Sequence, residues 1–160
     1  MKTYTAQELE VIIENHGKWL RDEDGGEKAD LSYSNLSYSN LRGCNLSGCN
    51  MRDCNMRGCN LSYSNLSDCN LSDCNMRGCN LSYSNLSDCN GLIYISQRSD
   101  GYQFFATYRD DKWLIQAGCR LLSPAEYRTH TEFYSCQKKR AETLLLIDFA
   151  EAMIAHRGIV

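Results

Sequence analysis

The chain has 160 residues, of which 20 are acidic and 17 basic, so its formal net charge is −3. Mixed charge and a single proline argue against a disordered chain, and the length allows one or two domains. No signal peptide or long apolar run is present, so we expect a cytoplasmic protein with no membrane contact.

Residues 1–26 are predicted to form a capping helix. Thr5 and Glu8 have the spacing of a capping box. A helical stripe of apolar side chains and one histidine follows: Leu9, Ile12, Ile13, His16 and Leu20. We expect His16 to pack in the cap rather than to bind a ligand, and Gly25-Gly26 to release the chain into the next segment.

Residues 31–90 consist of twelve five-residue units, each of which opens with Leu or Met and closes with Asn. Side chains alternate across an extended backbone, so the Leu or Met and the small residue two positions before it should share the inward side. The residues that follow the Leu or Met should point outward. Asn is suited to the turn, because its side chain bonds nearby backbone groups.

The repeat also predicts how many units complete one coil. Three of eight unit pairs are identical at an offset of four units, against one of nine at an offset of three. This favours four faces, 20 residues per coil and about three coils. Since a bare solenoid exposes strand edges at both ends, it needs caps, and the N-terminal helix is one candidate.

Eight of the ten cysteines occupy the small inward position of the repeat. Parallel Cβ vectors would strain a disulfide between stacked cysteines, so we expect buried free thiols. A zinc site is disfavoured because no histidine interleaves with them. The eight are Cys44, Cys49, Cys54, Cys59, Cys69, Cys74, Cys79 and Cys89.

The segment from about residue 27 to residue 90 resembles the pentapeptide-repeat family. Asp30-Leu31 and the Asn-Leu or Asn-Met pairs of later units match the family pattern Ala-(Asp/Asn)-Leu-x-x, although Ser or Cys replaces its Ala. The resemblance implies a right-handed four-sided β-helix. For function it implies little, since one fold hosts many functions; some relatives bind DNA gyrase or other topoisomerases by resembling DNA.

On four faces, the outward charged and aromatic side chains are sorted, with Arg52 beside Asp53 as the exception. The first face carries Asp53 and Asp73, the second Arg57 and Arg77, the third Arg42, Tyr63 and Tyr83, and the fourth Asp68 and Asp88. Arg57, Arg77, Tyr63 and Tyr83 are therefore candidate residues for electrostatic contact with a partner. The alternative is an ordinary solvated surface.

Residues 91–160 are predicted to be a separate small α/β domain with three strands and two helices. The strands are expected at 92–96, 102–108 and 112–116, with turns between them. Ser123, Pro124 and Glu126 indicate a helix start. The last helix is expected at 140–157, with a stripe made of Leu146, Phe149, Ala150, Met153 and Ile154. This large apolar face predicts a homodimer through the C-terminal domain.

Three stretches of this domain are similar to a domain that accompanies pentapeptide repeats in bacteriophage and prophage proteins. They are residues 96–102 (SQRSDGY), 117–120 (AGCR) and 141–143 (AET). The resemblance implies a phage or prophage origin and no particular chemistry.

Few residues suggest catalysis, since the three histidines are scattered and no phosphate-binding glycine loop is present. Cys119, activated by Arg120, is an alternative nucleophile, and Cys119, His130 and Cys136 form a still less favoured metal set. Anion or nucleotide binding is a further hypothesis, because Arg binds phosphate and aromatic faces stack on bases. Its residues are Arg98, Tyr102, Trp113 and Arg120.

Together these features predict a non-enzymatic cytoplasmic binding protein, with no cofactor or metal and no direct contact with nucleic acid. If phage-encoded, it would act in the host cytoplasm on a host factor, as an anti-defence protein that binds a defence protein or its nucleotide signal. The alternative is a DNA mimic that inhibits or protects DNA gyrase or another topoisomerase. The neutrality of the repeats, with four Asp and four Arg, opposes it.

Overall fold

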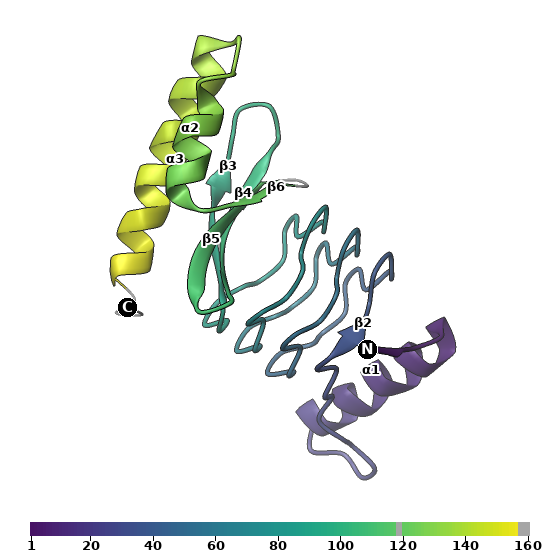
Figure 1. The fold of residues 1–160 in the computed structure, drawn as a ribbon. Coiled ribbons are helices and arrows are strands. Elements are labelled where there is room, and N and C mark those ends of the chain that lie inside the picture. The colour runs from purple at the N-terminus through teal and green to yellow at the C-terminus, as the bar shows by residue number, and fades with distance from the viewer. Residues whose placement is uncertain (118–119, 157–160) are drawn as a thin grey trace. The chain divides into compact units, whose positions relative to one another are not determined.

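A computed structural model describes residues 1–117 and 120–156. The chain divides into two compact units, residues 1–91 and the residues from Leu92 onward. Figure 1 shows the first unit as a helix followed by stacked turns, and the second as a small sheet with two helices. No described helix is long and apolar enough to cross a membrane.

The N-terminal helix α1 spans Ala6–Leu20 and begins with the predicted capping box. Glu8 donates its backbone N–H to the Thr5 hydroxyl, and the Glu8 carboxylate accepts the N–H of Thr5. Strand β1, Lys2–Thr3, precedes it and pairs in parallel with β2, Ser34–Asn35. The prediction of a helix with Leu9 and His16 on its buried side is confirmed.

His16 is fully buried and joins α1 to the first turns of the repeat. Its Nδ1 accepts the N–H of Ala29 at 3.2 Å, and its Nε2 lies 3.1 Å from the carbonyl oxygen of Ser47. Since a carbonyl only accepts, Nε2 carries the proton and the imidazole is neutral. Burial lowers the pKa of His16, because the charged form loses its hydration.

Backbone pairing in the repeat joins residues that are 20 positions apart. Parallel bridges run from Asp30–Asn50 to Asn70–Asn90. Within them, Leu41 donates its N–H to the Asn60 carbonyl at 2.8 Å, and Asn60 donates to the Ser39 carbonyl at 2.9 Å. The predicted stacking of extended five-residue units into a solenoid is confirmed by this pairing (Figure 1).

Each five-residue unit turns at its second and third residues. In nine units the N–H of the fourth residue donates to the carbonyl of the first, as Cys49 does to Leu46 at 3.0 Å. The third residue has a positive φ in every unit, as in a type II turn. This position holds Gly43, Gly48, Gly58, Gly78, Asp53, Asp68, Asp73, Asp88, Tyr33, Tyr38, Tyr63 and Tyr83.

The repeat asparagines stabilise these turns as predicted. The side-chain oxygen of Asn60, for example, accepts the N–H of Ser62 at 3.1 Å, two residues further on. Asparagines in adjacent turns also bond to one another, with Asn55 Nδ2 3.0 Å from Asn35 Oδ1. Six asparagines therefore support both their own turn and the stack, at positions 35, 45, 55, 65, 75 and 85.

The interior of the solenoid is formed by the predicted Leu and Met residues. Eleven of the twelve are buried, and Leu86 is partly exposed. The small inward residues also donate hydrogen bonds to the turn beneath them: Ser64 Oγ lies 2.7 Å from the Leu41 carbonyl and Cys69 Sγ 2.9 Å from that of Leu46. Ser and Cys thus contribute a donor that alanine would lack.

One outward residue is covered, contrary to expectation. Ser62 follows Leu61 and is only 1% exposed. The guanidinium of Arg42, one turn earlier, lies 3.4 Å from its hydroxyl. Pointing outward therefore does not ensure exposure, because a long side chain from a neighbouring turn can lie over a short one.

The second unit contains a four-stranded antiparallel sheet in the order β3-β4-β5-β6. The strands span Leu92–Gln97, Gln103–Arg109, Lys112–Ala117 and Arg120–Leu122. The prediction of three strands was therefore incomplete. The short β6 follows the strand predicted at 112–116 and lacks the length of periodic sequence that would reveal it.

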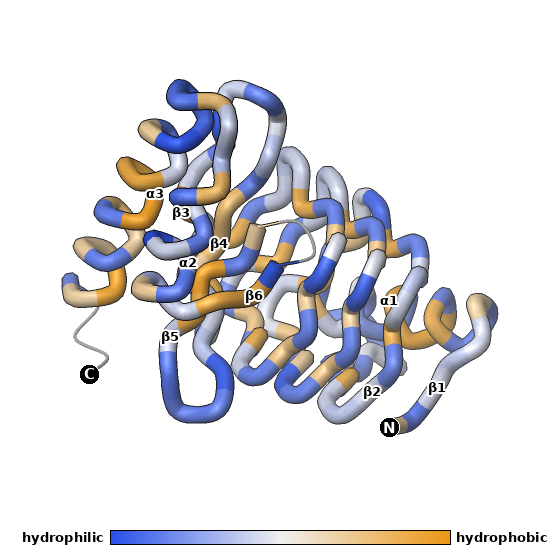
Figure 2. Tube along the Cα trace, turned by 45° about the horizontal axis from the view of Figure 1, so that its top comes forward, coloured by the Kyte–Doolittle hydropathy of each residue, from blue (hydrophilic) through white to orange (hydrophobic). Residues whose placement is uncertain are grey.

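Two helices pack on this sheet. Helix α2, Pro124–Thr131, starts with the predicted capping box of Ser123 and Glu126. Helix α3, Gln137–His156, begins three residues before the predicted start. The core combines residues of the sheet and both helices, and Figure 2 shows hydrophobic stretches in β4, β5 and α3. Core members include Ile93, Phe104, Ile115, Tyr127 and Ile147.

The predicted stripe of α3 is partly wrong. Ala150 is buried in the core and Met153 packs against it, but Phe149 is 51% exposed. Leu145, one helical turn before Phe149, is 68% exposed. Ile147 is buried in the core, because α3 packs against the sheet with the face that carries Ile147 and Ala150.

The inward position of the repeat can be tested by a matched pair of substitutions. Leu61→Asp should unfold the solenoid, because an unpaired buried carboxylate costs several kcal/mol against a total stability of roughly 5 to 15 kcal/mol. Tyr63→Asp, two residues on, should change the melting temperature little, since Asp occupies the same turn position in four units. Equal melting temperatures for both variants would contradict the inward assignment.

The buried His16 predicts a pH dependence of stability. Its pKa is lowered in the folded state, so the unfolded state binds the proton more readily. The free energy of unfolding should therefore fall as the pH drops through the unfolded value of about 6.5. Urea unfolding of the parent and of His16→Gln between pH 5 and 8 measures this.

The stability difference between these two proteins should shrink as the pH falls. His156→Gln, which removes an exposed histidine of α3, serves as the control and should follow the parent curve. A difference between parent and His16→Gln that stays constant with pH would contradict the assigned role of the neutral imidazole.

Candidate functional site

An exposed stack of aromatic rings lies on the surface of the solenoid. The rings of Tyr63 and Tyr83 are 4.9 Å apart and nearly parallel, at 21°. The guanidinium of Arg42 lies 4.4 Å from the centre of the Tyr63 ring, within cation–π distance. Tyr63 is 53% exposed and Tyr83 80%. We call Arg42, Tyr63 and Tyr83 the tyrosine ladder.

Both tyrosines of the ladder occupy strained backbone positions. Their φ values are +61°, in the left-handed region, which costs a side-chain-bearing residue about 1–2 kcal/mol. In eight other units this position holds Gly or Asp, which adopt such a conformation more readily. Because the rings are largely exposed, burial does not offset the strain.

Arg57 and Arg77 lie at the neighbouring corner, 20 residues apart. Both are exposed, and neither forms an ion pair within the described residues. The opposite arrangement holds at the corner of Arg52, whose guanidinium lies 3.2 Å from Asp53 and 3.6 Å from Asp73. Among the described residues, Arg57 and Arg77 thus have no ion-pair partner, whereas Arg52 has two.

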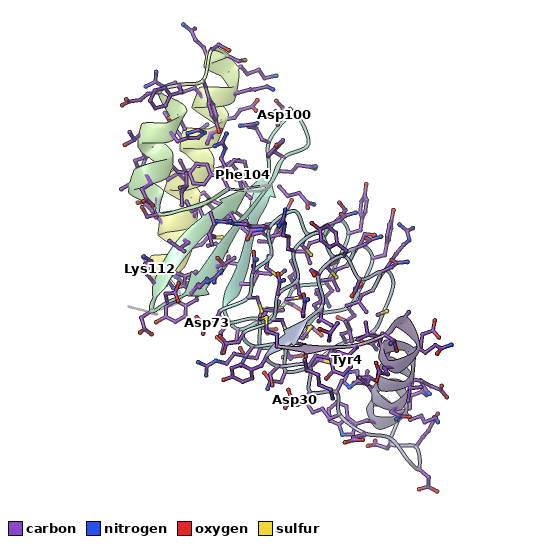
Figure 3. The ribbon with its side chains drawn as sticks, turned by 45° about the vertical axis from the view of Figure 1, so that its right-hand side comes forward. Tyr4, Asp30, Asp73, Asp100, Phe104 and Lys112 are labelled. Atoms are coloured by element: carbon purple, nitrogen blue, oxygen red, sulfur yellow. The ribbon has the colours of Figure 1, made fainter. Side chains whose placement is uncertain are left out.

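The second candidate region is a cavity of about 430 Å³ in the C-terminal unit. It brings together three of the four residues predicted for an anion or nucleotide site, Arg98, Tyr102 and Arg120. Its walls come from the β3–β4 turn, from β4, from the ends of β5 and β6, and from the segment that leads into α3. Figure 3 labels Asp100 on that turn and Phe104 on β4.

Arg98 is held rigidly at the edge of this cavity and is only 8% exposed. Its Nε and Nη2 donate to the two carboxylate oxygens of Asp100, both at 2.8 Å, and its Nη1 donates to Thr143 Oγ1 at 3.0 Å. These hydrogen bonds hold the pKa of Asp100 well below its usual range and raise that of Arg98. Both groups stay charged at neutral pH.

The cavity contains residues that the sequence analysis did not select. Lys139 Nζ lies 2.9 Å from Asp100 Oδ2, and the Arg98 guanidinium lies 5.6 Å from the ring centre of Tyr134. Asp100 lies in the turn expected between the strands at 92–96 and 102–108, and a turn signal does not predict an ion pair. Lys139 preceded the predicted helix start, so no helical position was assigned to it.

Trp113 does not belong to the cavity. It lies on β5, packs against the hydrophobic core and is 5.5 Å from the Tyr108 ring. Its predicted role in ligand binding therefore loses its geometric basis. Position along the strand decides this: Trp113 shares a face of β5 with Ala117, which lines the cavity, but it pairs with Tyr108 at the end of β4 far from the β3–β4 turn.

The buried cysteines of the repeat offer little nucleophilic or metal-binding chemistry. All nine described cysteines are free thiols, and burial raises the pKa of Cys49 to about 12 and that of Cys54 to about 11. Protonated thiols are poor nucleophiles and poor metal ligands. No group of three potential metal ligands occurs among the described residues. Cys119 lies outside them, so the alternative nucleophile and the predicted metal set are untested.

Comparison with known families finds pentapeptide repeats. Residues 27–62 and 54–90 match this family, with eight copies of the repeat. The match confirms the family predicted for this segment. The predicted resemblance of the C-terminal domain to phage proteins stays a prediction.

Similar solved structures include a pentapeptide repeat protein, Rfr23, and a fluoroquinolone resistance protein, QnrB1. Rfr23, from the cyanobacterium Cyanothece 51142, is 33% identical over 40% of this chain and 44% of its own, with a TM-score of 0.39. QnrB1, a plasmid-mediated fluoroquinolone resistance protein, is 28% identical over 38% of this chain and 28% of its own, with a TM-score of 0.36. The chain thus covers less than half of either structure. No curated protein matches it.

Proposed function

We propose that the chain is a non-enzymatic binding protein and that it contacts a partner protein through the surface of its repeats. This proposal starts from the match of residues 27–90 to pentapeptide repeats. We take the solenoid to be a right-handed, four-sided coil of about three turns. The tyrosine ladder is the observation that carries the proposal. Exposed aromatic side chains at strained positions gain little from burial in the free protein, whereas contact with a partner would bury them and offset their strain.

The chemistry of this surface points to an acidic partner. Tyr and Arg are enriched among the residues that dominate binding energies at protein interfaces. The two corners that carry the ladder and Arg57 and Arg77 hold three arginines and no carboxylate at their outward positions. Complementary charge would both speed encounter and orient the partner.

The C-terminal domain suggests the organism from which the partner protein comes. Its resemblance to a domain of phage and prophage proteins leads us to propose a bacterial host factor, such as a defence protein, that is bound and modulated in the host cytoplasm. The repeat surface would supply the contact, and the protein itself would carry out no chemistry.

Removing the ladder tests this proposal. Tyr63→Asn and Tyr83→Asn together should leave the fold intact, since Asn tolerates a positive φ. Retention of an acidic partner from a bacterial lysate should fall about tenfold or more, because several contacts worth about 1 kcal/mol each are lost. Mass spectrometry of the retained proteins measures this.

Tyr33→Asn is the matched control. Tyr33 is also exposed and has a positive φ, but it lies at the corner of Asp53 and Asp73. It should retain the partner like the parent. Equal retention by the double variant, or no protein retained by the parent, would reject the ladder as the contact surface.

DNA mimicry, with inhibition or protection of DNA gyrase or another topoisomerase, is the second candidate. Asp68 and Asp88 favour it, because they are exposed and form no ion pair within the described residues. About three turns at 4.8 Å each span about 14 Å. DNA carries one negative charge per roughly 1.7 Å, so a DNA segment of this length carries about eight charges. Two carboxylates are too few, so we rank it second. A supercoiling assay that shows inhibition at low micromolar protein would reverse the order.

Self-association through the C-terminal unit is also proposed. The exposed Leu145 and Phe149 lie one turn apart on α3 and form an apolar pair that a second copy would cover. Sedimentation of the full chain at micromolar concentration should give the mass of a dimer, and Leu145→Lys should give a monomer. A monomeric parent would contradict the prediction.

A further inference from the structure

We propose that the cavity of the C-terminal unit binds a nucleoside phosphate through Lys139, Arg120 and the aromatic rings around Arg98. This ligand site is separate from the repeat surface, so it does not depend on the partner protein proposed above. Three features support this site: the net positive charge of the cavity, the hydrogen-bond donors that its cations still offer, and the aromatic rings held beside Arg98.

The cavity has an excess of positive charge. Asp100 is the sole carboxylate among its lining residues, and it is shared by two cations, Arg98 at 2.8 Å and Lys139 at 2.9 Å. Arg120 adds a third cation. Three cations against one carboxylate leave a formal charge of +2, which favours an anion of similar charge such as a phosphate monoester.

Hydrogen-bond donors remain available on two of these cations. Lys139 carries three N–H groups, and its one ion pair within the described residues is with Asp100. Arg120 is exposed and forms no ion pair with a described residue, and the fork of its guanidinium matches the geometry of phosphate oxygens. We therefore assign phosphate binding to Lys139 and Arg120.

Arg98 has a positioning role rather than a direct one. Three of its nitrogens are engaged by Asp100 and Thr143, which ties the β3–β4 turn to α3. Its guanidinium also lies 5.2 Å from the ring centre of Tyr102 and 5.6 Å from that of Tyr134. The rings are thereby held in place before any ligand arrives, which lowers the entropy cost of binding.

Exposed aromatic rings in the cavity favour a ligand whose phosphate is attached to a nucleoside, because a base can stack on them. Tyr102 is 49% exposed and Phe133 79%, and both line the cavity. Stacking on such faces contributes about 1–3 kcal/mol per base in nucleic-acid-binding proteins. A volume of about 430 Å³ lies at the small end of ligand pockets, which span roughly 300–1,000 Å³. This size favours a single nucleotide over a longer chain.

Calorimetric titration of the full-length protein tests the site with four probes: adenosine monophosphate, uridine monophosphate, adenosine and inorganic phosphate. At least one mononucleotide should bind, and added salt should weaken its binding. Adenosine and inorganic phosphate should each bind about tenfold more weakly or worse, because each lacks one half of the contacts. No mononucleotide binding below about 1 mM would overturn the proposal.

Matched substitutions then locate the binding. Arg120→Gln should weaken nucleotide affinity about tenfold or more without changing the melting temperature, since it removes a charge-assisted contact from an exposed side chain. Arg140→Gln removes the same charge from the exposed surface of α3 outside the cavity and should bind like the parent. Equal affinity in both variants would reject the site.

Titration with an oligonucleotide distinguishes a site for single nucleotides from a surface that binds nucleic acid. A single-stranded hexanucleotide without terminal phosphates should bind no more tightly than adenosine monophosphate. Much tighter binding of the hexanucleotide would overturn the proposal in favour of nucleic-acid binding. Tyr63→Asn with Tyr83→Asn should leave the nucleotide titration unchanged, so failure of the partner-protein proposal and failure of this one are distinguishable.

Discussion

The parallel backbone pairing of residues 20 positions apart determines the geometry of the repeat unit. Each turn donates to the next through backbone groups, as Leu41 does to Asn60, and six of the asparagine side chains add hydrogen bonds between adjacent turns. Because this pairing uses the backbone, it constrains the conformation of every unit alike. The third residue of each unit must adopt a positive φ whatever its side chain is.

This constraint separates the structural positions of the repeat from the variable ones. The inward Leu or Met, the small donor and the Asn are nearly invariant within the chain, because each fills a fixed space or bonds a fixed backbone group. The second and third residues of each unit face outward and vary. Gly and Asp fit the third position at little cost, so tyrosine there requires a different explanation. The tyrosine ladder occupies these variable outward positions, where side chains can change without disturbing the inward residues of the solenoid.

The C-terminal unit is organised differently, around one buried charged group. Arg98 connects the turn between β3 and β4 to α3 through Thr143, and Asp100 balances its charge. A buried guanidinium without these partners would be costly, so the three residues form one interdependent cluster. Lys139 shares Asp100 and extends the cluster toward the cavity. The same contacts that stabilise the turn therefore place cations and aromatic rings beside each other.

The sequence by itself determined the features that depend on local chemistry. The five-residue period revealed the inward residues and the asparagine turns, and the capping boxes at Thr5 and Ser123 marked two helix starts. Each of these signals lies within a few residues of the element that it specifies. The 20-residue spacing was also suggested, because repeated units preserve their positions in the stack.

Only the tertiary structure decided which distant residues meet. Arg98 and Thr143 are 45 positions apart and Ser99 and Glu142 are 43 apart, and no periodic pattern links them. For the same reason the sequence grouped Trp113 with Arg98, missed Lys139 and did not reveal that Arg42 covers Ser62. Such contacts depend on how strands and helices pack, since packing, unlike a turn or a cap, is set by side chains from several segments at once.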